Sequence, residues 1–376
     1  MEFKIKSVGK KWKMINNIMF QKEFCDLRKI IFSKYMKVTL FFLLIIFIYS
    51  DKINILLKFI ADYNYNHNFL NYSIIYDEYD ENIDKKYKYF QNYFCENQDK
   101  NFNKEFEKRI TKTKYIFNGK NFDIYVYKDS DLVSSSIIKN HHYEGYYEKK
   151  ILKALEFYSK KKGIENKDIY FLDIGANIGC HSFFFGNNGY KILSFEANKI
   201  NNYILYKNYC LNKNINITII NKGLDEEDKI CKLKIAPNNR GDGTIFCENR
   251  EPDFSAFNGD IYNNIELTKL SRYMKFFSDK NLAVMKIDVE GYEGKIIKGG
   301  KEIISEYHVP FIMMEFSVKL LKLHQTDILE FLQIFENNGY KFSLVDFLSK
   351  KYISPEKLMK KKSRVNVFIF YEKFLK

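Results

Sequence analysis

Residues 171–179 read FLDIGANIG, and no other segment constrains the fold of this chain as strongly. An apolar run that ends in Asp173 and continues into Gly175 and Gly179 predicts a buried strand, a sharp turn and a helix. The glycine spacing is G-x-x-x-G, whereas dinucleotide-binding proteins have G-x-G-x-x-G at this place. Asp173 would repel a pyrophosphate but is compatible with a ligand that carries an amino group or a neutral sugar. The motif predicts either a site for such a ligand or a plain strand–turn–helix without one.

Two other acidic motifs follow predicted strands. Glu196 ends the next strand along the chain, where a carboxylate can bind both hydroxyls of a ribose. Lys286, Asp288 and Glu290 are two residues apart, so an extended strand turns them toward one side. A buried lysine needs a charged partner, and Asp288 is the natural one. We expect a ligand site at these strand ends; the alternatives are a solvent-exposed Glu196 and a purely structural ion pair.

The chain from residue 119 onward alternates between strand and helix patterns. This is typical of an α/β fold, in which helices cover both faces of a mostly parallel sheet. We predict strands at 122–127, 169–174, 191–195, 216–220, 282–287, 311–316, 341–345 and 365–371. We predict helices at 148–162, 177–186, 198–212, 293–306 and 327–338. Residues 226–265 are polar and unpatterned, so no element is assigned to them.

The formal net charge of +14 is concentrated at the N-terminus. Residues 1–37 hold ten Lys or Arg against three Asp or Glu, hence +7, and the uncharged run VTLFFLLIIFIY follows at 38–49. A basic flank before an apolar run is typical of a signal anchor, although the run is shorter than the ~20 residues of a usual span. A cleaved signal peptide and a buried helix are the alternatives. Because half of the charge precedes the apolar run, it indicates membrane topology, and we expect no nucleic-acid partner.

Composition supports a folded domain behind this anchor. A hydrophobic fraction of 46% excludes wholesale disorder, and six Cys without a C-x-x-C pair argue against a disulfide scaffold or a zinc knuckle. The predicted organisation is a basic tail (1–37), a signal-anchor helix (38–50), a stem or lead-in region (51–118) and a catalytic domain (119–376). The oligomeric state is left open.

Several motifs together resemble the FkbM-type methyltransferases, a branch of the Rossmann-like enzymes that use S-adenosylmethionine. They are FLDIGANIG (171–179), SFEAN (194–198), LTKL (267–270), KIDVEGYE (286–293) and MMEF (313–316). The resemblance covers roughly residues 132–370. It implies a class I methyltransferase fold with a seven-stranded sheet whose last strand is antiparallel. It also implies S-adenosylmethionine as methyl donor and transfer to oxygen, often on sugars or polyketides and occasionally to nitrogen.

The resemblance also assigns roles to single residues. The cofactor-binding positions would be Asp173, Gly175, Ala176, Asn177, Gly179, Glu196, Leu224 and Asp225. The acceptor substrate would meet Glu148, Asn239 and Glu315, with Glu144 as the alternative to Glu148. Asp288 and Glu290 would be catalytic, and one of them would take the proton of the acceptor hydroxyl. We expect no metal; the alternative is a divalent ion among Asp288, Glu290, Glu293 and Glu315.

Two other functions compete with this interpretation. Asp129 and Asp131 form the D-x-D pattern of metal-dependent glycosyltransferases, which are also anchored behind a stem. A non-catalytic, membrane-tethered binding module is the second alternative. We favour an anchored methyltransferase that acts on a hydroxyl of a glycan or a small molecule. Its domain would face the lumen of the endoplasmic reticulum or Golgi.

Overall fold

The computed structural model describes residues 83–97, 104–129, 131–236, 239–247 and 261–376. The predicted basic tail, the predicted anchor at 38–50 and the stem up to residue 82 lie outside these residues. Within the described ranges, no helix combines the length and the apolar character that a membrane span requires.

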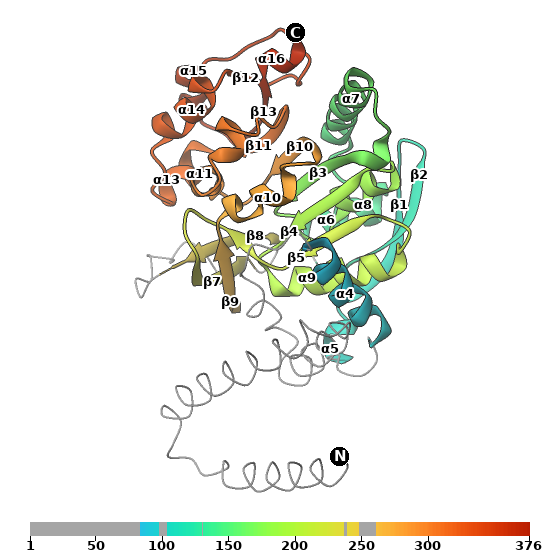
Figure 1. Ribbon diagram of the computed structural model, residues 1–376. Coiled ribbons are helices and arrows are strands. Elements are labelled where there is room, and N and C mark those ends of the chain that lie inside the picture. Colours follow the sequence, from blue (N-terminus) through green and yellow to red (C-terminus); the bar gives the residue numbers. More distant parts are fainter. Residues whose placement is uncertain (1–82, 98–103, 130, 237–238, 248–260) are drawn as a thin grey trace, which may run out of the picture. The chain divides into compact units, whose positions relative to one another are not determined.

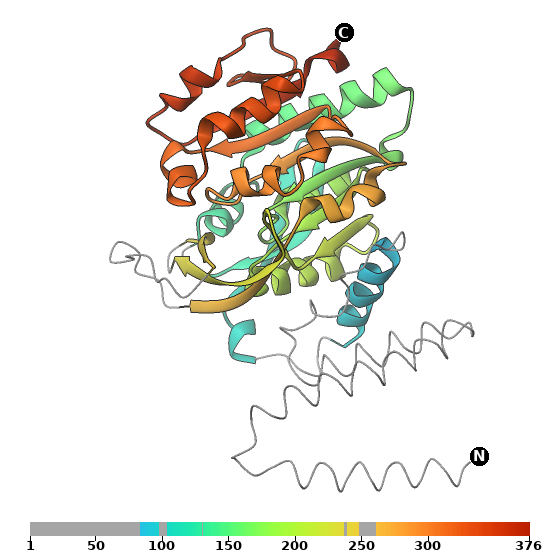
Figure 2. The ribbon, with the colours of Figure 1, turned by 60° about the vertical axis from the view of Figure 1, so that its left-hand side comes forward.

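A seven-stranded sheet forms the centre of the described domain (Figures 1 and 2). Its strands are β3 (Ile169–Ile174), β4 (Lys191–Phe195), β5 (Ile217–Ile220), β10 (Asn281–Ile287), β11 (Phe311–Phe316), β12 (Tyr340–Ser343) and β13 (Val365–Tyr371). The order is β12-β13-β11-β10-β3-β4-β5. Strand β13 is antiparallel to both of its neighbours, and all other pairs for which the register is given are parallel. This confirms the predicted sheet with its antiparallel last strand.

Alternating residues of β3 explain why both faces of the sheet are covered. Ile169 and Phe171 belong to one hydrophobic core, and Tyr170, Leu172 and Ile174 belong to the other. Such a strand is buried on both faces, so its sequence is a continuous apolar run. Figure 1 shows helices α7 (Gly145–Lys162) and α8 (Cys180–Asn187) on one side of the sheet, and α11 (Glu293–Lys298) and α14 (Ile328–Asn337) on the other.

Further helical elements lie among the described residues. They are α5 (Lys104–Glu107), α6 (Leu132–Asn140), η2 (Asn166–Asp168), α9 (Lys199–Leu211), η3 (Leu270–Tyr273), α10 (Met274–Phe277), α12 (Glu302–Ser305), α13 (Val318–Leu323), α15 (Pro355–Met359) and α16 (Glu372–Leu375). The single helix predicted at 293–306 is divided into α11 and α12 at Gly299 and Gly300, where a Cβ would meet Asp225 and Leu270.

Two elements that precede residue 119 pack onto the domain. Strand β1 (Ile110–Phe117) forms an antiparallel hairpin with β2 (Lys120–Tyr127). Helix α4 (Ile83–Glu96) covers the edge strand β5, where the Gln91 side chain donates to the Ile217 carbonyl and accepts from the Ile219 N–H. This contact protects an edge that would otherwise be open to pairing. A disulfide between Cys95 and Cys210 joins α4 to α9.

A second, four-stranded sheet occupies most of the segment to which the sequence analysis assigned no element. Its strands are β6 (Gly223–Leu224), β7 (Lys229–Ala236), β8 (Asn239–Phe246) and β9 (Ile261–Thr268), in the order β6-β9-β7-β8. The expectation of an unpatterned loop at 226–265 is therefore wrong. Cys231, Leu233 and Ile235 form its inner face with residues of β9, and a disulfide joins Cys231 to Cys247. Polar residues dominate the other positions, which hides the alternation.

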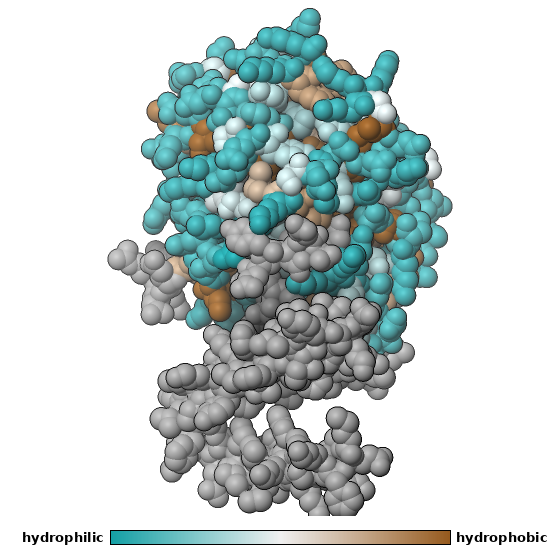
Figure 3. Space-filling view, in the orientation of Figure 1, coloured by the Kyte–Doolittle hydropathy of each residue, from teal (hydrophilic) through white to brown (hydrophobic). Residues whose placement is uncertain are grey.

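The surface visible in Figure 3 is mainly hydrophilic, with hydrophobic residues scattered over it. Among the described residues, the most exposed large hydrophobic side chains are Ile230, Tyr146 and Leu132. Single apolar side chains of this kind are common on protein surfaces.

Candidate active site

A cavity opens at the carboxyl ends of β3, β4, β10 and β11 and is bounded on one side by the second sheet. This is where ligands bind in open α/β sheets. Of the predicted residues, the cavity lining includes Gly175, Ala176, Asn177, Glu196, Leu224, Asp288, Glu290 and Glu315. The lining does not include Asp173, Gly179, Asp225 or Glu148. Asn239 lies at the start of β8, and its neighbours Arg240 and Gly241 line the cavity.

The turn after β3 is shaped by glycine and by backbone in the left-handed region. Gly175, Asn177 and Gly179 have φ angles of 81°, 53° and 90°. A Cβ on Gly175 would lie 2.0 Å from the carbonyl oxygen of Asp288, so only glycine allows the turn to approach β10. The turn delays the start of α8 to Cys180, three residues after the predicted start.

Glu196 ties this turn to the end of β4. Its Oε2 accepts a hydrogen bond from the Asn177 N–H at 2.7 Å, and its Oε1 accepts one from the Asn198 N–H at 2.7 Å. Burial raises the pKa of Glu196 to about 7. The carboxylate lines the cavity, where its remaining lone pairs are available to the hydroxyls of a ligand.

Asp173 lies beneath the turn rather than in the cavity wall. Its Oδ2 accepts a hydrogen bond from the Ser182 hydroxyl at 2.5 Å, and the Ser182 and Ser194 hydroxyls are 2.8 Å apart. The other oxygen, Oδ1, is buried without a hydrogen-bond partner. The negative charge below the turn favours a cationic ligand group above it.

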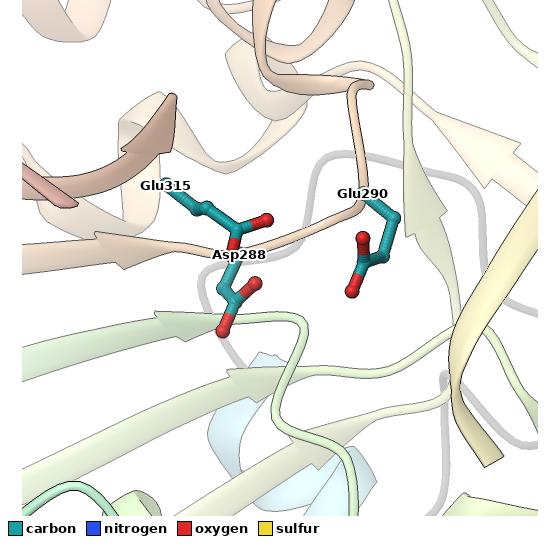
Figure 4. A group of neighbouring side chains, drawn as sticks. All are labelled: Asp288, Glu290 and Glu315. Atoms are coloured by element: carbon teal, nitrogen blue, oxygen red, sulfur yellow. The ribbon is translucent and has the colours of Figure 1, made fainter. Parts of the chain in front are cut away.

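Three carboxylates gather in the cavity wall at the ends of β10 and β11. Asp288 and Glu290 follow β10 and Glu315 lies on β11; their oxygens come within 4.8 Å of one another, which is close enough to hold a metal ion (Figure 4). Two cations lie among them. Lys286 Nζ is 3.0 Å from Asp288 Oδ2, and Arg364 contacts Glu290 at 2.9 Å and Glu315 at 3.3 Å.

The charges of this cluster follow from burial and pairing. Burial would raise the pKa of Asp288, but the Lys286 ammonium outweighs it and holds that pKa below its usual value. Burial would lower the pKa of Lys286, but Asp288 and Asp173 outweigh it, so Lys286 keeps its proton. Burial and the neighbouring Asp288 raise the pKa of Glu315 to about 8. Glu315 therefore binds a proton more tightly than Asp288 does.

Two residues that line the cavity, Arg364 and His181, were not predicted from the sequence. Arg364 follows a run of lysines just before β13 and carries no motif. His181 is buried on α8, with Nδ1 3.1 Å from Glu148 Oε1 and Nε2 3.3 Å from Glu144 Oε2. Glu144 lines the cavity, whereas Glu148 is fully buried behind His181. Of the two acceptor-side alternatives, the structure thus brings Glu144 to the cavity. The single residue His181 could not indicate these contacts in the sequence, because its partners Glu144 and Glu148 lie at the start of another helix, α7.

The D-x-D residues have structural partners. Asp129 Oδ2 accepts from Arg109 at 3.0 Å and from Arg240 at 2.7 Å. Asp131 caps α6 by accepting from the Ser134 N–H, and its other oxygen accepts from the Arg240 N–H. These contacts join β8 of the second sheet to the start of α6. Both carboxylates thus have hydrogen-bond partners within the protein, and a sugar nucleotide is not needed to explain them.

The strand order and the glycine turn define a class I methyltransferase domain. Residues 173–342 match the family model of the methyltransferase FkbM domain. The matched residues form an FkbM methyltransferase domain, as the motifs predicted, and a domain of this kind supports S-adenosylmethionine-dependent methyl transfer. No curated protein matches the sequence.

Several solved methyltransferase structures are similar at low identity. Precorrin-6y C5,15-methyltransferase from Geobacter metallireducens GS-15 is 14% identical, with 58% of this chain and 86% of that chain covered and a TM-score of 0.28. The T. Thermophilus 16S rRNA N2 G1207 methyltransferase, in complex with AdoMet and guanosine, is 8% identical over 70% and 51%, with a TM-score of 0.32. A TehB-like methyltransferase from Corynebacterium glutamicum is 9% identical over 57% and 87%, with a TM-score of 0.29. The fold assignment rests on the strand order of the central sheet, not on these likenesses.

S-adenosylmethionine is the methyl donor of this domain, and the cavity fits it. Glu196 offers a carboxylate to ribose hydroxyls, and Leu224, Leu233 and Ile245 form an apolar wall suited to an adenine ring. The uncompensated Oδ1 of Asp173 lies beneath the glycine turn, which suits the positive charge of the methionine end.

Proposed function

We propose that this methyltransferase transfers the methyl group to a hydroxyl oxygen of a glycan or a small molecule. The observation that carries this proposal is the cluster of Asp288, Glu290 and Glu315 in the cavity wall. Carboxylates bind hydroxyl groups and accept their protons, which a methyl acceptor must lose as the new bond forms. Among the described residues, Cys180 is the unpaired cysteine, and it is buried.

The cofactor supplies a methyl group on a positively charged sulfur. The acceptor oxygen forms a bond to the methyl carbon as the carbon–sulfur bond breaks, and the chain contributes mainly by holding the two in line. We propose that Asp288 and Glu290 contact the acceptor hydroxyl. Lys286 and Arg364 fix the orientation of these two carboxylates through their ion pairs.

Methyl transfer from labelled S-adenosylmethionine to extracted glycans and to free hexoses tests this function directly. We expect label in the glycan fraction as an alkali-stable methyl ether, and Asp288→Asn to reduce it by about 100-fold, because an acceptor that is held out of line reacts more slowly. A matched control is Glu156→Gln, because Glu156 is exposed on α7 away from the cavity. Label on an amine instead of a hydroxyl would overturn the O-transfer. Transfer of label from a nucleotide sugar with Mn²⁺ would instead favour a glycosyltransferase.

We also propose that the chain is a single-pass membrane protein whose domain faces the lumen of the endoplasmic reticulum or Golgi. The basic tail and the apolar run at 38–49 support the anchor. The disulfides Cys95–Cys210 and Cys231–Cys247 support an oxidising compartment, because disulfides are rare in the cytosol. Protease protection in sealed microsomes tests the orientation: a domain digested without detergent would contradict it.

A further inference from the structure

Four side chains form a connected chain that reaches from the interior of the domain to the cavity. The Tyr115 hydroxyl donates to Glu148 Oε1 at 2.6 Å, and the same oxygen lies 3.1 Å from His181 Nδ1. The other ring nitrogen of His181 faces Glu144 Oε2 at 3.3 Å. Tyr115 and Glu148 are fully buried and His181 nearly so, while Glu144 lies at the cavity. Burial of these four polar side chains costs free energy that apolar side chains at the same positions would not cost.

Resting on the proposed function, we propose that Glu144 is the catalytic residue that accepts the proton of the acceptor hydroxyl. His181 is a positioning residue for it, with Glu148 and Tyr115 holding the imidazole from behind. In the step, the acceptor O–H bond breaks and its proton binds to the Glu144 carboxylate. The oxygen electron pair forms the bond to the methyl carbon, and the carbon–sulfur electron pair stays on sulfur. The proton leaves Glu144 to solvent after the methylated product departs.

Charge balance favours Glu144 over the two carboxylates predicted from the sequence. Glu144 and Glu148 both contact His181, so Glu144 can take up a proton while His181 keeps its contact with Glu148. Asp288 and Lys286 form a neutral pair, and a proton on Asp288 would leave a buried ammonium without its partner. Glu290 is held by Arg364, which also bridges to Glu315. Because Lys286 and Arg364 hold the carboxylates of Asp288 and Glu290 in place, these two side chains suit binding of the acceptor more than removal of its proton.

The backbone at Glu144 supports a functional role. Glu144 begins α7 with φ at 50°, a conformation that costs a non-glycine residue free energy. Asn177 and Glu290, which also line the cavity, have the same unusual backbone. Strained residues concentrate at functional sites, where the strain holds a side chain in position.

The electrostatic surroundings of this group come from four segments of the chain. The titratable groups that act on Glu144, His181 or Glu148 are Tyr115 on β1, His142 and Tyr143 before α7, Cys180 on α8, and Lys286 and Asp288 at the end of β10. Burial would lower the pKa of His181, but Glu144 and Glu148 outweigh it and raise that pKa to about 9. The imidazolium is therefore retained across the neutral range.

The first test measures methyl transfer to extracted glycans by the full chain and by Glu144→Gln. We expect kcat to fall by about 100-fold or more while S-adenosylmethionine still binds within about twofold of the wild-type affinity. The control Glu156→Gln keeps the wild-type rate. His181→Asn should lower kcat less than Glu144→Gln does and shift the pH profile of kcat, a change that a purely structural role would not produce. A Glu144→Gln rate near that of the wild type would overturn the proposal.

The second test needs no acceptor. Sinefungin carries an ammonium-bearing carbon where S-adenosylmethionine carries its methylated sulfur, whereas S-adenosylhomocysteine has no charge there. If Glu144 faces the methyl position, Glu144→Gln weakens sinefungin by at least about threefold relative to S-adenosylhomocysteine. An unchanged ratio of the two dissociation constants would overturn the role of Glu144. Wild-type protein that binds neither compound would instead contradict the methyltransferase function itself.

Discussion

The carboxylate of Glu196 accepts a hydrogen bond from the backbone N–H of Asn177 at 2.7 Å. This single contact joins the glycine turn after β3 to the end of β4, so two motifs that are separate in sequence form one wall of the cavity. Its consequence is that the shape of this wall depends on a carboxylate that also lines the cavity.

Gly175→Ala should destabilise the domain by at least about 2 kcal/mol, because the left-handed backbone and the contact with β10 both oppose a side chain. Gly189→Ala is the matched control: Gly189 has φ at 90°, but its nearest neighbour would lie 3.7 Å from the new Cβ. Denaturant unfolding of both variants separates the steric contact from the backbone strain. Equal losses in the two variants would show that the close approach to Asp288 is not needed.

The stability of the domain should fall as the pH rises from about 6.5 to 9. The pKa of His181 is raised from 6.5 to about 9 in the folded state, so its contribution is complete below 6.5 and is lost as the pH rises through 9. At most this contribution is on the order of 3 kcal/mol. Urea unfolding across this pH range should show a shallower decline for His181→Asn than for the wild type. Parallel curves would remove His181 as the cause.

Reduction of the two disulfides should destabilise the domain unequally. The Cys95–Cys210 bond closes a loop of 115 residues and Cys231–Cys247 one of 16, so chain entropy predicts losses of about 5 and about 3 kcal/mol. Thermal unfolding of Cys95→Ser and Cys231→Ser, each compared with the oxidised wild type, checks the order. Free thiols at these four positions in protein isolated from cells would contradict the lumenal location.

Chelation should leave methyl transfer unchanged. Lys286 and Arg364 already neutralise charge among Asp288, Glu290 and Glu315, which reduces the need for a cation there. Turnover measured before and after dialysis against EDTA provides the test. Activity that disappears on dialysis and returns with Mg²⁺ would assign the three carboxylates to a metal.

Sequence patterns predicted the central sheet because its strands are buried on both faces, which makes runs such as Ile169–Ile174 continuously apolar. The cofactor turn was predictable for a local reason, namely that Gly175 and Gly179 permit positive φ angles. The second sheet was missed because single apolar residues of β7, such as Cys231 and Leu233, alternate with lysines and leave no continuous apolar run.

The acceptor side of the site was harder to predict than the cofactor side. Arg364 and Glu290 are 74 residues apart, and neither Arg364 nor His181 belongs to a recognisable motif. The family resemblance favoured Glu148 over Glu144, but the structure places Glu144 at the cavity and Glu148 behind His181. Such relationships depend on how helices pack, which local patterns do not encode.

Calorimetric titration of the full chain in detergent with S-adenosylmethionine tests the central claim most directly. We predict one binding site per chain, and a loss of affinity of about tenfold for Glu196→Gln, because the amide cannot replace the carboxylate that accepts from Asn177 and Asn198. The control Glu156→Gln should bind like the wild type. Absence of binding by the wild type, or full affinity in Glu196→Gln, would contradict the account of this site.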